Sequence, residues 1–465
     1  MTIELIVRGG TVWTPSGMVR ADVVVEGEKI AAVVDDASAR GLTGGRVIDA
    51  TGRVVIPGLI DTHTHHRDPG FTHKEDVTTA TRAAAAGGVT MSVGMPNVQP
   101  PTVTAEQFAA LVGDQAKRAI VDFNHNPSPT RVDEIHELSR LGCLAYKLFM
   151  IADTKRSYPH IPALGVHDSG ELLRVAEKVA ETGKPLMVHP HDQRVMDVIE
   201  GQYWGRGEYD YMAYARAYRD YGGLVFDSAI STLIEIQRST GVRLHVLHLN
   251  TEEGVRLVRG AKAAGRRVTG EVNPWALFSG GPWEELPKHG PYALGVWVPP
   301  DDQRAVWNGV HDGTIDVCGT DHAPHTREEK EVGWKRMWEA AGGMPCVQDY
   351  LSLFLTEVHR GRMTLDEVVR LCSYNVARVF GLYPRKGVIQ VGADADLAVL
   401  DLNTKREIRD EDAYSRCGWS LFHGRIVTGI PVYTVVRGKV VMEHGKVVGE
   451  PGWGKFVPPV DGGSR

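Results

Sequence analysis

Val54-Val-Ile-Pro-Gly-Leu-Ile-Asp61-Thr-His63-Thr-His65 joins an apolar run to two closely spaced histidines. Side chains alternate between the two faces of an extended strand, so Asp61, His63 and His65 should point to one face. Two imidazoles on one face, at the end of a buried strand, can chelate a metal ion. Because an isolated His-x-His pair is usually coincidental, the metal interpretation depends on further ligands elsewhere in the chain.

Four further candidate ligands end other apolar runs downstream. They are Lys147, His189, His248 and Asp321. A lone histidine at the end of a strand is more often a hydrogen-bonded structural residue than a ligand. The convergence of these four residues with His63 and His65 on one rim of the barrel instead predicts a metal centre.

The middle of the chain alternates apolar strands with helical patterns. Eight strands are predicted, at residues 54–61, 89–95, 119–123, 143–149, 185–189, 243–248, 267–272 and 315–320. Most are followed by a helix that ends at glycine, such as 76–86, 169–182 (with Ser169 as its N-cap) and 251–264. Eight such units predict an α/β fold, a TIM-like (β/α)8 barrel.

Both ends of the chain have a different sequence pattern, in which short β-like runs alternate with Gly- and Asp-rich turns. Such runs occupy residues 4–48 and return at 396–402 and 432–443. We therefore predict one small β-sandwich from both termini, residues 1–56 and 386–465 with the C-terminal tail, around an inserted barrel domain, residues 57–385.

Two stretches do not fit a plain barrel. Residues 196–226 are rich in aromatic side chains from Tyr203 to Tyr221, and residues 320–346 form a long charged segment. Both leave the C-terminal ends of predicted strands, where such a barrel carries its active site. The aromatic stretch is equally compatible with an interface or with a helix packed on the barrel.

The bulk properties narrow the class of protein. The 465 residues are 42% hydrophobic and 24% charged, typical of a soluble globular protein. A net charge of -6 argues against nucleic acid or an anionic membrane as the main partner, although a small anion would still fit a basic pocket. The five dispersed cysteines indicate free thiols in a reducing compartment. Without a signal peptide or a long apolar stretch, we expect a cytoplasmic protein.

Lys147 is the least expected polar residue, since it lies in an apolar strand. A lone buried ammonium costs several kcal/mol or loses its proton. A neutral, desolvated lysine can react with carbon dioxide to form a carbamate, a bidentate anion able to bridge two metal ions. A Schiff-base lysine and a buried ion pair are the rival interpretations. The surrounding imidazoles favour the carbamate, because they supply the cations that would bind it.

Two divalent ions would suit this set of ligands. The negative charges of the carbamate, Asp321 and a bridging hydroxide would neutralise most of the charge of the two ions. The small positive charge that remains would polarise a substrate carbonyl. Asp321 is placed to take the hydroxide proton and pass it to the departing nitrogen. Imidazoles with carboxylate-like oxygens suit zinc, with manganese or cobalt as alternatives.

Over nearly its whole length the chain resembles the cyclic amidohydrolases: dihydroorotase, allantoinase and hydantoinase (dihydropyrimidinase). The matching segments are residues 57–65, 82–90, 146–150, 188–189, 245–248, 321–325 and 392–397. The resemblance implies that His63 and His65 bind one metal ion and His189 and His248 the other. It further implies that carbamylated Lys147 bridges them and that Asp321 is both ligand and acid–base catalyst. Relatives are commonly dimers or tetramers, so the resemblance also implies a homo-oligomer.

Within that group, Arg67, Asn97 and His325 match a set known from dihydroorotase. A guanidinium, an amide and an imidazole on one rim suit a small carboxylate substrate. The alternative is that Arg67 and His325 pair with local acids such as Asp68 or Asp76.

The chain also departs from dihydroorotase. The departures are Pro190-His191-Asp192 after His189, Asn273-Pro274-Trp275 after the seventh strand, and the aromatic stretch. They suggest a bulkier or more apolar ring, such as a substituted hydantoin or imide. We interpret His191 as a group in the third shell around the metal ions or an extra polar contact rather than as a metal ligand.

The leading hypothesis is a binuclear metal-dependent hydrolase that opens a ring amide by attack of a metal-bridging hydroxide. It would act on a cyclic ureide or imide, dihydroorotase-like by the Arg67, Asn97 and His325 set. A hydantoinase- or allantoinase-type enzyme acting on a bulkier or aryl-substituted ring is the alternative. A catalytically silent scaffold is disfavoured because every ligand is present, and a deaminase because Lys147 implies two metal ions.

Overall fold

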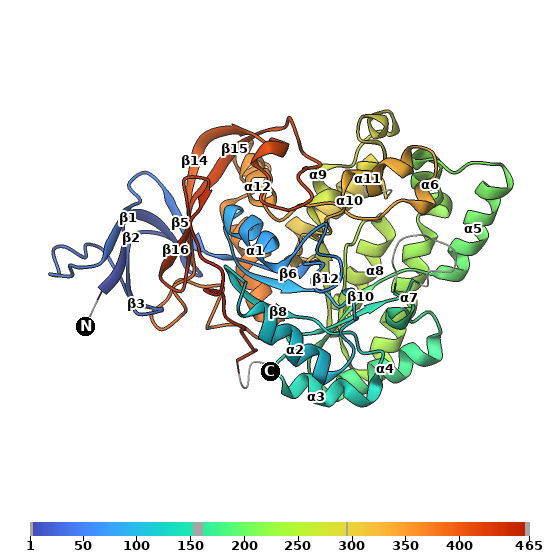
Figure 1. The fold of residues 1–465 in the computed structure, drawn as a ribbon, viewed down its shortest axis with the longest axis horizontal. Helices are drawn as coiled ribbons and strands as arrows, with labels where there is room; N and C mark the ends of the chain where they lie inside the picture. The colour runs from blue at the N-terminus through green and yellow to red at the C-terminus, as the bar shows by residue number, and fades with distance from the viewer. Residues whose placement is uncertain (1–2, 152–160, 294–295, 461–465) are drawn as a thin grey trace.

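The computed structural model describes residues 3–151, 161–293 and 296–460 of the chain. A nine-stranded sheet lies at one end, and a parallel barrel, built from a five-stranded and a three-stranded sheet, lies beside it within a layer of helices (Figure 1). The predicted (β/α)8 barrel with a β domain from both termini is therefore confirmed. Within the three described ranges, every helix is too short or too polar to span a bilayer.

The barrel strands follow one another in chain order. They are β6 (Leu59–Thr64), β7 (Val89–Gly94), β8 (Asp122–His125), β9 (Tyr146–Phe149), β10 (Pro185–His189), β11 (Arg243–Val246), β12 (Val268–Val272) and β13 (Val317–Cys318). The two sheets join where the Lys147 N–H donates to the Pro127 carbonyl (2.9 Å) and the His65 N–H donates to that of His322 (2.7 Å). Every residue of β6 to β9 is buried, as expected for parallel strands covered on both faces.

Helices cover the outside of the barrel and its mouth. They are α1 (Val77–Ala86), α2 (Ala105–Gln115), α3 (Ile135–Arg140), α4 (Ser169–Thr182), α5 (Gln193–Gly205), α6 (Tyr211–Ala217), α7 (Leu224–Thr240), α8 (Glu252–Ala263), α9 (Pro274–Phe278), α10 (Pro300–His311), α11 (Arg327–Glu331), α12 (Tyr350–His359), α13 (Leu365–Val369) and α14 (Asn375–Val379). The predicted N-cap Ser169 is wrong by one residue. The Asp168 carboxylate accepts from the Gly170 and Glu171 N–H groups instead, as an ionised N-cap side chain does.

The terminal sheet combines strands from both ends of the chain. They are β1 (Ile3–Thr14), β2 (Gly17–Glu26), β3 (Lys29–Val34), β4 (Arg46–Asp49), β5 (Val54–Pro57), β14 (Leu397–Glu407), β15 (Ile426–Val436), β16 (Lys439–Glu443) and β17 (Lys446–Val447). The blue and red strands meet at the antiparallel pair β5–β14, with Pro57 opposite Leu397 (Figure 1).

The first predicted barrel strand, residues 54–61, is in fact two strands. β5 belongs to the terminal sheet and β6 to the barrel, and the chain crosses between them at Gly58. The Gly58 N–H donates to the Asp396 carbonyl at 2.9 Å, and a Cβ at this position would collide with the Thr90 side chain. Gly58 therefore allows the close approach through which the terminal sheet leads directly into the metal-ligand strand.

A buried ionic cluster connects the terminal sheet to the barrel. Lys386 Nζ lies 2.7 Å from Asp122 Oδ2 on β8 and 3.1 Å from Asp394, and it also contacts Asp396. Arg437 Nε donates to Asp122 Oδ1 at 2.9 Å. Asp122, Lys386 and Arg437 are at most 1% exposed, so each charge depends on the others for compensation.

Replacing Asp122 with Asn should therefore destabilise the protein strongly. Removing one member of a buried ion pair leaves uncompensated charge, typically at a cost of about 3–5 kcal/mol. We expect a lower urea midpoint and a lower melting temperature by circular dichroism. Asp133→Asn, in the exposed pair with Arg131, is the control and should change neither. Equal urea midpoints for the two variants would show that the ionic cluster does not couple the terminal sheet to the barrel.

Candidate active site

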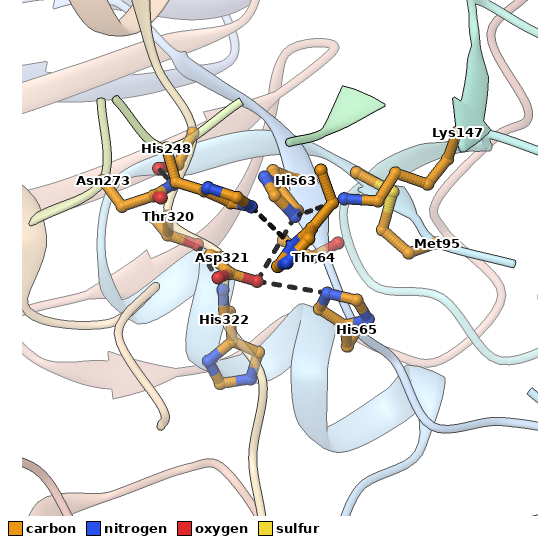
Figure 2. A network of polar contacts seen from close by, with 12 residues as sticks. His63, Thr64, His65, Met95, Lys147, His248, Asn273, Thr320, Asp321 and His322 are labelled. Atoms are coloured by element: carbon orange, nitrogen blue, oxygen red, sulfur yellow. Dashed lines mark hydrogen bonds and ion pairs between the residues drawn. The ribbon is translucent and has the colours of Figure 1, made fainter. Parts of the chain in front are cut away.

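The six predicted ligand residues line one pocket at the C-terminal mouth of the barrel. β6 carries His63, and His65 directly follows its last residue. β9 carries Lys147, and His189 is the last residue of β10; His248 follows β11 and Asp321 follows β13. Figure 2 shows the His63, His65, Lys147 and His248 side chains gathered around Asp321. The ends of separate parallel strands therefore supply a single polar cluster.

His63, His65 and Asp321 form the tighter half of this cluster. Asp321 Oδ1 lies 3.1 Å from His65 Nε2 and 3.3 Å from His63 Nε2. The ligand atoms of the three residues all lie within 4.8 Å of one another. Lys147 Nζ lies 3.3 Å from His63 Nε2. One carboxylate oxygen, two imidazole nitrogens and an amine thus face a common point.

His189 and His248 form the other half. His189 Nδ1 and His248 Nε2 are 2.8 Å apart, and the ring centroids are separated by 4.4 Å. The ring of His248 also lies 6.1 Å from that of His63, which brings the two halves together. Two imidazole nitrogens in such proximity are suited to share one cation.

Burial and neighbouring charges set the protonation states. Desolvation lowers the pKa of Lys147 to about 8, although Asp321 and Glu271 act in the opposite direction. Desolvation also lowers the pKa values of His65 and His248 to about 3, so both imidazoles are neutral at neutral pH. Burial alone would raise the pKa of Asp321, but the adjacent imidazoles bring it well below its usual range. The pocket thus presents neutral imidazoles, a carboxylate and an easily deprotonated amine.

The backbone at the pocket is strained. Among the described non-glycine residues, six have a positive φ, and Arg67 (58°), His248 (38°) and Asp321 (50°) line this pocket. L-residues rarely adopt this conformation, and such strain tends to cluster at functional sites. The strain is consistent with side chains that are placed for chemistry rather than for packing.

Two residues behind the cluster orient its imidazoles. Asn97 Oδ1 lies 2.6 Å from His65 Nδ1, and Glu271 Oε1 lies 2.7 Å from His63 Nδ1. Both contacts place the ring proton on Nδ1 and leave Nε2 free to bind a cation. Glu271 was missed in the sequence, where it is one acidic residue inside the apolar run 267–272. Asp61 points away from the pocket, since its carboxylate accepts from the His63 and Thr320 N–H groups, both at 3.1 Å.

The three predicted substrate-binding residues differ in their positions. Arg67 and Asn97 line the pocket, whereas His325 lies behind Arg67 and is completely buried. His325 Nε2 is 2.9 Å from Arg67 Nη2 and 3.1 Å from the Gly342 carbonyl. Asp68 and Asp76 have other partners, because Asp68 pairs with Arg118 and Asp76 with Arg416. His325 nevertheless lies beside a local acid, with its Nδ1 3.4 Å from Glu329 Oε2. Substrate binding by these three residues stays a prediction.

Aromatic side chains form a further part of the pocket lining, here called the aromatic wall. They are Phe149, Tyr214, Tyr218, Phe226 and Trp275. The Tyr218 and Phe226 rings stack at 5.6 Å with an interplanar angle of 28°, and the Tyr214 and Tyr218 hydroxyls are 3.3 Å apart. The aromatic stretch thus contributes to the pocket through α6 and the residues around it. His191 is buried 5.9 Å from the Tyr218 ring and does not line the pocket.

Comparison with known proteins identifies the family. The model of the amidohydrolase family matches residues 54–441. The chain belongs to this family. An L-hydantoinase from Paenarthrobacter aurescens is 32% identical over 463 residues, with 98% of each chain covered. A dihydroorotase from Methanosarcina acetivorans is 31% identical over 468 residues, 98% of this chain and 95% of that one.

Solved amidohydrolase structures agree with this assignment. The L-hydantoinase (dihydropyrimidinase) from Arthrobacter aurescens superposes with a TM-score of 0.92 at 32% identity, covering 98% of this chain and 100% of that one. Dihydropyrimidinase from Brevibacillus agri gives 0.87 at 27% identity, covering 98% of both. The protein is thus a cyclic amidohydrolase of the hydantoinase and dihydroorotase type, as the sequence predicted.

Amidohydrolases of this type use a binuclear metal centre with a carboxylated lysine, and the donor set of this pocket fits one. Imidazole nitrogens and an ionised carboxylate converge from four strands, and the amine of Lys147 faces the same point. The low pKa of Lys147 favours the neutral amine that reacts with carbon dioxide. His63, His65, His189, His248, Asp321 and a modified Lys147 would hold the ions.

Removing the Lys147 amine should therefore remove metal. We expect Lys147→Ala to fall from about two bound ions per chain to one or none, with loss of activity. Metal analysis by mass spectrometry after dialysis measures this, and propionate added with zinc should restore part of both. Lys178→Ala, on the exposed face of α4, is the control. Full metal content in Lys147→Ala without added carboxylate would exclude a bridging role.

Proposed function

We propose that the protein opens a cyclic ureide or imide that carries an apolar, aromatic-sized substituent. The observation that supports this proposal is the composition of the pocket lining. The polar cluster shares the pocket with the aromatic wall of Phe149, Tyr214, Tyr218, Phe226 and Trp275. A ring amide at the polar cluster would place its substituent against aromatic faces, which bind apolar groups by burial and stacking.

The chemistry follows from the ligand set. Two divalent ions, when bound, would lower the pKa of a water molecule and polarise the ring carbonyl. Asp321 is ionised at neutral pH and is therefore able to accept a proton and deliver it to the departing ring nitrogen. Neutral imidazoles with carboxylate-type oxygens favour zinc, with manganese or cobalt as alternatives. A homo-oligomer, as implied by the resemblance, stays a prediction.

Dihydroorotate is the second candidate substrate, and Arg67 favours it. The Arg67 guanidinium lines the pocket although the residue is only 2% exposed. A planar guanidinium can bind a substrate carboxylate through two parallel hydrogen bonds. The aromatic wall leaves little reason for a small, anionic substituent to be preferred, so we rank this function second.

A substrate panel tests the proposal. We expect zinc-loaded protein to hydrolyse 5-phenylhydantoin with a kcat/KM at least about tenfold above that for hydantoin, because the pocket buries the ring substituent. Dihydrouracil, allantoin and dihydroorotate complete the panel. Turnover of each substrate is measured by absorbance and by chromatography of the products. Turnover confined to dihydroorotate would overturn the first proposal and establish the second.

Two variants separate the candidates further. Phe226→Ala should lower kcat/KM for the aryl substrate by about tenfold through lost stacking and burial, with little change for hydantoin. Arg67→Lys should raise KM for dihydroorotate by about ten- to a hundredfold, because Lys lacks the planar fork. Tyr218→Phe keeps the ring and serves as control. If Phe226→Ala left kcat/KM for the aryl substrate unchanged, the aromatic wall would not contact the substrate.

A further inference from the structure

A buried carboxylate lies directly beneath the metal-ligand cluster. Glu271 is on β12, completely buried, and does not line the pocket. It is distinct from the six ligand candidates, because its carboxylate faces the inner side of the His63 ring. A charge so far from solvent is costly unless it interacts with a definite partner.

The contacts of Glu271 fix its position. Oε1 lies 2.7 Å from His63 Nδ1 and accepts from Asn273 Nδ2 at 3.1 Å. Oε2 faces His245 Nε2 at 3.7 Å, and His245 Nδ1 is 2.7 Å from Thr269 Oγ1. Next to β13, a Cβ at Gly319 would collide with Glu271 Oε2, so the neighbouring chain leaves room for this carboxylate.

This contact determines how His63 presents its nitrogens. An ionised carboxylate only accepts hydrogen bonds, so His63 must carry its proton on Nδ1. The lone pair of Nε2 then points to the side where Lys147 Nζ and Asp321 Oδ1 lie, each at 3.3 Å. An imidazole with the other tautomer would turn an N–H toward the cations.

His65, two residues further along the chain, provides an internal comparison. Its Nδ1 faces the neutral amide oxygen of Asn97 at 2.6 Å, whereas His63 faces a full negative charge at a similar distance. The two histidines therefore have the same orientation but different electrostatic support. Glu271 is a second carboxylate beside the cluster, after Asp321, and its negative charge acts on Lys147 in the pocket, where it would also favour bound cations.

We propose that Glu271 is a positioning residue, which fixes the His63 tautomer and raises the affinity of the pocket for its metal ions. The inference depends on the proposed metal-dependent function. A merely structural role would instead stabilise the barrel through the His63, Asn273 and His245 contacts without affecting metal affinity.

Glu271→Gln distinguishes these roles, because it gives His63 the same kind of neutral amide partner that His65 already has. We expect metal affinity to fall by about ten- to a hundredfold, as is typical when such a supporting group is lost. The measurement is metal content after equilibration with graded concentrations of a chelator. Glu181→Gln, in the exposed pair with His136, is the matched control and should bind metal like the unmodified protein.

The outcomes distinguish a failure of the proposed function from a failure of the role assigned to Glu271. Unmodified protein that fails to bind about two ions would refute the proposed function itself. Unmodified affinity in Glu271→Gln, with normal binding by the parent, would refute the role of Glu271 alone. A lower melting temperature of the metal-free variant with unchanged affinity would show a purely structural residue.

A second measurement keeps Glu271 in place and does not require Glu271→Gln to fold. Zinc-loaded protein labelled with ¹⁵N-histidine should show His63 with its proton on Nδ1, and the signal is assigned by its loss in His63→Gln. A proton on Nε2 would overturn the inference.

Discussion

Removal of water from charged groups is the constraint that shapes this protein. Lys147 and Glu271 are buried in the barrel together with the imidazoles between them, and the side chain of Asp321 keeps only 15% of its exposure. None of these groups is tolerable alone, because each would lose its hydration without compensation. Their convergence makes the arrangement tolerable. Burial lowers the pKa of Lys147, and the adjacent imidazoles lower the pKa of Asp321, which gives the protonation states on which ligation depends.

Much of the fold and of the ligand set followed from periodicity. A polar residue that closes a buried parallel strand must emerge at the same edge as its neighbours, so six separate positions predicted one pocket. The split of residues 54–61 was not visible, because it depends on pairing between Pro57 and Leu397 at the other end of the chain. Glu271 had no spacing signal, and the depth of His325 depends on how Arg67 packs. Which tyrosines of the aromatic stretch face the pocket depends on the packing of α6.

The pocket combines two kinds of recognition that usually belong to different substrates. The lining includes Arg67, a permanent cation, together with the aromatic wall. The chain is 32% identical to an L-hydantoinase and 32% identical to a dihydroorotase, so sequence identity does not decide between the two substrates either. Both candidate reactions open a ring amide, so discrimination between them would depend on the side chains that contact the ring substituent.

The pairing of β5 with β14 has a consequence for synthesis on the ribosome. At about 5–20 residues per second, β14 emerges roughly tens of seconds after β5. During that interval the edge of β5 has no C-terminal neighbour, although it leads directly into the strand that carries His63. A nascent chain would thus expose an apolar edge next to an unfinished barrel, a situation in which chaperone binding during translation is advantageous.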